Sequence, residues 1–170
     1  MRLKEKLSKK QIIYLILIAI WMIAIFIFSN QPGTQSENTS ESVTSKLINI
    51  ASQIINIEQN TKENLIQILD PIMRKLAHFT IYLIGGFLIM NFANTYKAKE
   101  TTKIAYSIIA GMIYAGTDEL HQYFIEGRSC LITDVFIDTL GVATGVYIFL
   151  LMFTIYKKIK NKGIKLDNNN

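Results

Sequence analysis

The chain has 170 residues, 50% of them hydrophobic, and a single cysteine, Cys130. This composition excludes a disordered chain, and a lone cysteine excludes a fold held together by internal disulfides. The net charge of +5 does not indicate nucleic-acid binding, because the Lys and Arg residues flank apolar runs and form no continuous patch. The chain has the length of one domain and the charge pattern of a membrane protein.

Four apolar runs predict an all-α fold, a four-helix transmembrane bundle with spans at about residues 12–28, 76–96, 104–125 and 135–156. The first run follows a basic segment, residues 1–11. No Ala-x-Ala-like cleavage site comes after Phe28, so we expect an uncleaved anchor instead of a signal peptide. Asp70 and Pro71 precede the second run. An N-cap residue followed by proline predicts that this helix begins there.

The third run is too short to cross a membrane by itself. Residues 104–117 form a helix of ~21 Å, whereas the hydrocarbon core is ~30 Å thick. The helix is long enough only if it continues to Ile125, and it then carries several polar residues at the outer margin of the membrane: Asp118, Glu119, His121 and Gln122. The fourth run begins directly after Asp138.

The distribution of charge predicts the orientation of the chain. Five Lys and Arg residues precede the first run, three lie between the second and third runs, and five follow the fourth. Ten of the 13 acidic residues lie in the other two connections. Because basic residues mark the cytoplasmic side, we expect a multi-pass protein of the cell membrane with both termini in the cytoplasm.

The connection between the first two spans, residues 29–70, is expected on the outer side. Residues 34–42 are polar and are predicted to form a loop. From Val43 the apolar residues recur at helical spacing, which predicts an amphipathic helix. This helix either lies on the outer membrane surface or packs against the spans. The basic tail, residues 157–170, is polar at its end and is expected to be disordered.

Three of the predicted helices each present a polar stripe: Lys75, His78 and Tyr82 on the second, Asp118, His121 and Gln122 beside Glu119 on the third, and Asp134 and Asp138 with Gly141 and Gly145 on the fourth. Residues at these spacings share one helix face. The loops that border the stripes contain Ser29, Gln31 and Arg128. We expect all of these side chains to meet in one space.

Each of these residues also has a purely structural interpretation. The acidic residues before the fourth span can cap a helix, Lys75 and Arg128 can reach lipid headgroups, and a single histidine can simply be hydrogen-bonded. Their convergence favours a functional site, because an unpaired charge at this depth costs a few kcal/mol.

Two kinds of chemistry fit these side chains. Histidines and carboxylates can bind a divalent metal, but no diagnostic ligand spacing such as HExxH is present, so we assign no metal ligand and leave the cofactor open. They can also act as general acids and bases, and the candidates for this role are His78, His121, Asp118, Glu119 and Asp138. Lys75 and Arg128 are suited to holding an anion. The candidate substrate-binding residues are Ser29, Gln31, Lys75, Tyr82, Gln122, Arg128 and Asp134.

Four motifs carry a resemblance to a known family: Phe28-Ser29-Asn30-Gln31-Pro32-Gly33; Arg74-Lys75-Leu76-Ala77-His78-Phe79 with Tyr82; Thr117-Asp118-Glu119-Leu120-His121-Gln122 with Gly127-Arg128; and Asp134-Val135-Phe136-Ile137-Asp138-Thr139-Leu140-Gly141. In this order, over residues 12–156, they resemble VanZ-like membrane proteins. The sequence departs from the family pattern at Glu126, where proline is common, and at Cys130, where a small residue is usual.

The resemblance implies a small multispan protein of the bacterial cell envelope, in a family whose namesake is associated with teicoplanin resistance. It also implies that the twelve candidate residues given above, all of which lie in these motifs, are the functional ones, but it names no reaction. Our first hypothesis is an outward-facing pocket that binds or modifies an anionic lipid or a lipid-linked cell-wall precursor. The alternatives are a small transporter or ion relay, and a non-enzymatic interaction protein of the membrane.

Overall fold

The computed structural model describes residues 7–55 and 57–167, and the predictions made for residues 1–6 and 168–170 lie outside this range. The all-α prediction is confirmed, since the described residues contain helices and no strands. The helices are α1 (Lys9–Ser29), α2 (Gly33–Ile54), α3 (Gln59–Ala93), α4 (Glu100–Gln122) and α5 (Ile132–Asp167).

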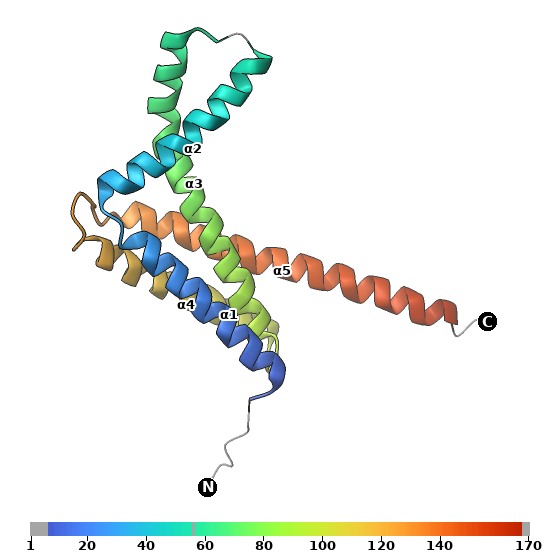
Figure 1. The fold of residues 1–170 in the computed structure, drawn as a ribbon. Coiled ribbons are helices and arrows are strands. Elements are labelled where there is room, and N and C mark those ends of the chain that lie inside the picture. Colours follow the sequence, from blue (N-terminus) through green and yellow to red (C-terminus); the bar gives the residue numbers. More distant parts are fainter. Residues whose placement is uncertain (1–6, 56, 168–170) are drawn as a thin grey trace.

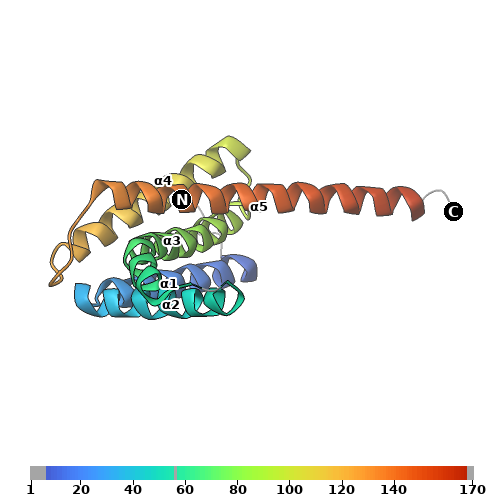
Figure 2. The same cartoon turned by 90° about the horizontal axis from the view of Figure 1, so that it is seen from above.

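The helices form a bundle with two projections (Figures 1 and 2). α1, α4 and the C-terminal part of α3 pack side by side. The N-terminal part of α3 pairs with α2 in a hairpin that extends away from this bundle. α5 crosses α3 and then continues away from the other helices to its C-terminal end.

Three helices are long and apolar enough to cross a membrane: α1, α3, and α5 from Ile132 to Asn161. α4 is not among them, and it carries acidic residues at both ends, Glu100 at its start and Asp118 and Glu119 near its end. The described chain therefore has the helices of a membrane protein, with three clear candidates where the sequence predicted four spans.

The bundle is centred on aromatic and small residues. Trp21 of α1 lies edge-on to Tyr82 of α3, and its indole Nε1 donates a hydrogen bond of 2.8 Å to the carbonyl of Ile81. Where α3 and α5 cross, a Cβ added to Gly86 would overlap the backbone of Val142, and one added to Gly145 would overlap the carbonyl of Leu83. These glycines bring the two backbones into contact.

Two predicted helix starts are wrong. α2 begins at Gly33, so residues 34–42, predicted as a loop, are helical. They are polar because most of this helix segment is exposed, and apolar periodicity does not detect such a helix. α3 begins at Gln59 and passes through Pro71. Proline removes only one backbone hydrogen bond and bends the helix, and the ribbon of α3 bends between the hairpin and the bundle (Figure 1).

Two predicted helix ends also differ from the structure. α4 ends at Gln122, so the third apolar helix does not continue to Ile125. α5 continues to Asp167, so most of the tail predicted to be disordered is helical. Lys and Ile are both compatible with a helix. Polarity alone therefore does not distinguish an exposed helix from a disordered tail.

The predicted amphipathic helix is part of α2. Thr44 and Ile48 are buried, whereas Val43, Leu47 and Ile50 on the same helix remain about half exposed. α2 packs against α3, as one of the two alternatives expected, and it still presents apolar side chains outward.

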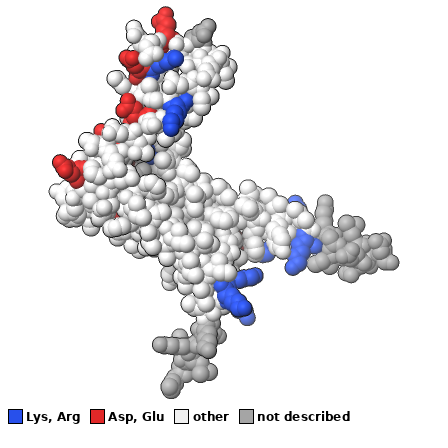
Figure 3. All heavy atoms as spheres, viewed as in Figure 1, with Lys and Arg blue, Asp and Glu red and all other residues white. Residues whose placement is uncertain are grey.

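Charge is unevenly distributed over the visible surface (Figure 3). Asp and Glu residues gather over the α2–α3 hairpin and the neighbouring end of the bundle. Away from the hairpin, Lys and Arg residues gather at the opposite end of the bundle and on the projecting part of α5.

Candidate functional site

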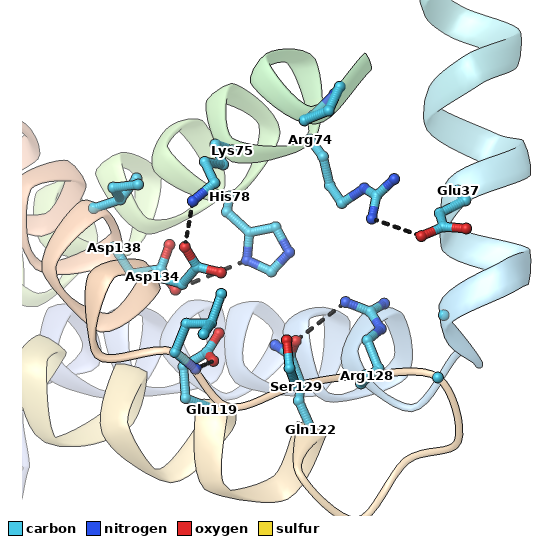
Figure 4. A pocket seen from close by; sticks show the side chains of 15 residues that line it. Glu37, Arg74, Lys75, His78, Glu119, Gln122, Arg128, Ser129, Asp134 and Asp138 are labelled. Atoms are coloured by element: carbon cyan, nitrogen blue, oxygen red, sulfur yellow. Dashed lines mark hydrogen bonds and ion pairs between the residues drawn. The ribbon is translucent and has the colours of Figure 1, made fainter. Parts of the chain in front are cut away.

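A polar cavity of about 240 Å³ lies at the hairpin end of the bundle, between α3, α4, α5 and the first turns of α2 (Figure 4). The side chains that line it come from all four helices and from the α4–α5 loop. Its polar lining residues are Glu37, Arg74, Lys75, His78, Glu119, Gln122, Arg128, Ser129, Asp134 and Asp138.

α3 contributes three nitrogen-bearing side chains to the cavity. Lys75 Nζ forms an ion pair of 2.7 Å with Asp134 Oδ1 on α5. Arg74 lies between two carboxylates, at 3.0 Å from Asp70 and 3.5 Å from Glu37 (Figure 4). His78 is two turns beyond Asp70 and one turn beyond Arg74, and all three lie on one face of the helix.

The deepest part of the site contains two buried carboxylates. The Asp138 side chain is 1% exposed, and its Oδ2 lies 3.8 Å from His78 Nδ1. That distance is longer than a hydrogen bond, and both oxygens of Asp138 are buried without a hydrogen-bond partner. Asp118 accepts hydrogen bonds from the Tyr82 hydroxyl at 3.2 Å and from Gln122 Nε2 at 3.0 Å.

Arg128 closes the cavity from the α4–α5 loop. Its Nη1 donates to Gln122 Oε1 at 3.1 Å, its Nε donates to the Gln31 carbonyl at 3.2 Å, and its Nη2 donates to the Phe28 carbonyl at 3.4 Å. Burial lowers the pKa of the Arg128 guanidinium, and the nearby charge of Arg74 lowers that pKa further. An arginine nevertheless stays charged in a protein. Ser29 completes this network by accepting from Gln122 at 3.4 Å.

Two glycines explain why residues 28–33 lie against the turn at Gly127 and Arg128. The Gly33 amide donates to the Glu126 carbonyl at 2.9 Å, and a Cβ added to Gly33 would overlap the carbonyl of Gly127. Gly127 itself has φ 72°, a conformation that favours glycine. The start of α2 is thereby held against the loop that carries Arg128.

The structure separates the two histidines. His78 lines the cavity, whereas His121 is not among the lining residues. The His121 ring stacks on Phe26 of α1 with a centroid separation of 4.8 Å, and its Nε2 is buried without a hydrogen-bond partner. Glu119 lines the cavity but accepts a hydrogen bond of 3.2 Å from the Leu131 amide, so it also holds the α4–α5 loop.

A second cavity is an apolar groove of about 610 Å³ bounded by α1, α2 and α3. Its apolar lining residues include Ile25, Phe28, Val43, Met73, Leu76, Ala77, Ile81 and Ile84. Arg74, His78 and Arg128 line both this groove and the polar cavity. The two cavities therefore meet at these three side chains.

Most of the predicted site residues come together. Seven of them line the polar cavity: Lys75, His78, Glu119, Gln122, Arg128, Asp134 and Asp138. Ser29, Gln31, Tyr82 and Asp118 are joined to them through the hydrogen bonds described above. His121 is the exception, because it faces Phe26.

Sequence reasoning missed three polar residues that line the cavity: Glu37, Arg74 and Ser129. Arg74 was not included in the stripe of Lys75, and Glu37 falls in the segment expected to be a loop. The spacing of Asp70, Arg74 and His78, at i, i+4 and i+8, is a signal that identifies Arg74. Nothing in the sequence places Glu37 beside it.

The fold and the cavity define an all-helical protein with membrane-spanning character and a buried cluster of ionisable groups at one end. The family model described as VanZ/LLP1 matches residues 14–153. This chain belongs to the VanZ-like family. No curated protein and no solved structure matches the chain.

Proposed function

We propose that the polar cavity binds the anionic headgroup of a lipid or of a lipid-linked cell-wall precursor. The observation that carries this proposal is the junction of the two cavities, where Arg74 and Arg128 stand between a polar pocket and an apolar groove. An amphiphile with a negatively charged head and a hydrocarbon chain matches both surfaces at once.

The cations of the site support an anionic headgroup. Arg74 lines both cavities, and its Nε has no hydrogen-bond partner among the described residues, although its other nitrogens contact Asp70 and Glu37. Arg128 uses its donors on neutral groups, two backbone carbonyls and an amide, and keeps a full positive charge at the cavity. Guanidinium groups bind phosphate and carboxylate through paired hydrogen bonds.

The groove supports a lipid over a water-soluble anion. It is about 610 Å³ in volume, and most of its accessible surface is apolar, with Ile, Leu, Val, Phe, Met and Ala side chains among those that line it. A hydrocarbon chain matches this apolar surface, whereas a small water-soluble anion has nothing to contact there. For a reaction on the bound headgroup, His78 beside Asp138 is the group placed to transfer a proton.

The proposed location is the outer face of a bacterial cell membrane, with four spans and both termini in the cytoplasm. The charge distribution supports this orientation, because acidic residues gather at the cavity end and basic residues at the other end (Figure 3). In this arrangement α4 also crosses the membrane, as the third of the four spans, and its apolar part from Ile104 to Thr117 packs one face against the other helices. An effect on teicoplanin susceptibility would follow if the headgroup belongs to a cell-wall precursor.

A thermal-shift experiment tests the proposal. The purified protein in neutral detergent should be stabilised by phosphatidylglycerol or a polyprenyl phosphate, and not by phosphatidylcholine. At a ligand concentration of 100 times Kd the expected gain is ~2.7 kcal/mol, or roughly 5–10 °C.

Arg128→Gln should lose most of this shift. Lys46→Gln removes a charge from α2 at a position that lines neither cavity, and it should keep the shift. Equal stabilisation by charged and zwitterionic lipids would refute the proposal.

A further inference from the structure

Three potential metal ligands meet at the base of the polar cavity, one from each of three helices. His78 comes from α3, Asp118 from α4 and Asp138 from α5. One donor atom of each lies within 4.8 Å of the other two. The ligands are far apart in the sequence, which is why no ligand motif was visible there.

Apart from the His78 imidazole at 3.8 Å, Asp138 has no ion-pair or hydrogen-bond partner among the described residues. It is completely buried, and neither of its oxygens has a hydrogen-bond partner. Buried carboxylates are normally hydrogen-bonded, paired with a cation or coordinated to a metal. Gly141, three residues further along α5, packs against the backbone of α3 at Phe79, so the two helices lie in close contact beside Asp138.

The described residues provide too little positive charge for this cluster. Asp118 accepts hydrogen bonds only from neutral groups, Tyr82 and Gln122. Among the residues that the structure describes, no Lys or Arg side chain forms an ion pair with Asp118 or Asp138. The nearest lysine in the cavity, Lys75, is already paired with Asp134. Two carboxylates therefore face one imidazole.

We propose that His78, Asp118 and Asp138 bind a divalent transition-metal ion, with Zn²⁺ and Mn²⁺ as the ions best matched to one imidazole and two carboxylates. This ligand set joins an intermediate donor to two hard oxygen donors, as these ions prefer. Three protein ligands leave a coordination position open, which is typical of sites that bind a further molecule. His78 and Asp138 line the cavity, so an ion held by them would be reachable from it.

The observed geometry requires only a small contraction. Ligand atoms around Zn²⁺ lie ~2.0–2.2 Å from the ion and so about 3.3 Å from one another. The present spread is at most 4.8 Å, so the widest donor pair has to approach by about 1.5 Å for all three ligands to reach one ion. Tyr82 and Gln122 would then orient Asp118 as outer hydrogen-bond donors. Metal binding at this site does not require a bound lipid. A negative result for the metal therefore does not refute lipid binding, and a negative result for lipid does not refute metal binding.

Metal analysis of the full chain in detergent, without added lipid, tests the inference. After incubation with Zn²⁺ or Mn²⁺ and removal of free ions, the wild-type protein should retain about one ion per chain and show a raised Tm. Asp138→Asn and His78→Ala should each abolish both effects. Glu100→Gln, a carboxylate change at the opposite end of α4 from Asp118 that lines neither cavity, should retain the ion.

Asp138→Asn also guards against a folding artefact. It removes an uncompensated buried charge at nearly constant volume, so the metal-free variant should unfold at the same temperature as the metal-free wild type or higher. A wild-type protein that retains neither ion would overturn the inference, as would an Asp138→Asn protein that retains the same amount. Lipid stabilisation that persists in a metal-free wild type would leave the proposed function intact.

Discussion

The two histidines have the same chemistry and opposite surroundings. His78 faces a cavity lined by Arg74, Arg128 and Asp138, whereas His121 is stacked on Phe26 in the packing between α4 and α1. Sequence spacing places His121 on one face of α4 with Asp118, but it does not show that both side chains contact the same neighbours. A stripe of three residues covers a wide sector of a helix, however, and its edge can face a different neighbour.

Substitution of the two histidines should therefore have different effects. His121→Ala removes a stacking contact, so we expect a loss of about 1 kcal/mol of stability with an unchanged lipid-induced thermal shift. His78→Ala should reduce the lipid-induced shift with a smaller change in the stability of the lipid-free protein. Thermal unfolding of both variants, with and without phosphatidylglycerol, measures the two quantities together. The account fails at this point if His121→Ala removes the lipid effect and His78→Ala preserves it.

Other residues show which parts of the site are readable from the sequence. Asp118 and Gln122 are one turn apart on a helix, and they are joined by a hydrogen bond as this spacing predicts. Arg128 and Gln31 are also in contact, although 97 positions separate them. Their contact depends on Gly33 packing against Gly127, which no periodicity reveals.

At the level of helices, the crossing of α3 and α5 positions the site. It brings Lys75 to Asp134 and His78 to Asp138, two pairs with the same order along both helices. The backbones touch at Gly86, Gly141 and Gly145, so the crossing point is fixed by close contact. The glycine stripe predicted from the sequence has this packing role.

A methyl group at the crossing should separate the helices. A Cβ at position 145 would overlap the carbonyl of Leu83, which is backbone and cannot rotate away. We expect Gly145→Ala to cost about 1–3 kcal/mol, measured as a lower midpoint of thermal unfolding. Gly116→Ala is the matched control, because a Cβ there has nothing within 4 Å. It should be neutral or slightly stabilising, and an equal loss in both variants would argue against close packing at the crossing.

The helix limits were predicted less well than the helices themselves. Apolar periodicity finds the buried centre of a helix, but α2 and the end of α5 are largely polar and exposed. Pro71 was a reasonable start signal and stands inside α3. The helix tolerates it because a proline on an exposed face costs one hydrogen bond and a bend.

For the whole molecule, sequence patterning predicted the fold class and most of the residues that meet in the cavity. It did so because ionisable residues within apolar helices are costly and rare, and their positions are informative. The hairpin of α2 with α3 and the apolar groove beside it were not predictable. Both depend on where a polar helix packs, and such a helix carries little pattern.

The proposed function depends on the cavity opening at the outer surface of the membrane. The one cysteine of the chain is a built-in reporter, because Cys130 is exposed in the loop that carries Arg128. A membrane-impermeant maleimide applied to intact cells should label the wild-type protein. A Cys130→Ser protein with Lys157→Cys should react only after the cells are permeabilised. Labelling of Cys130 that requires permeabilisation would place the cavity in the cytoplasm and contradict the account.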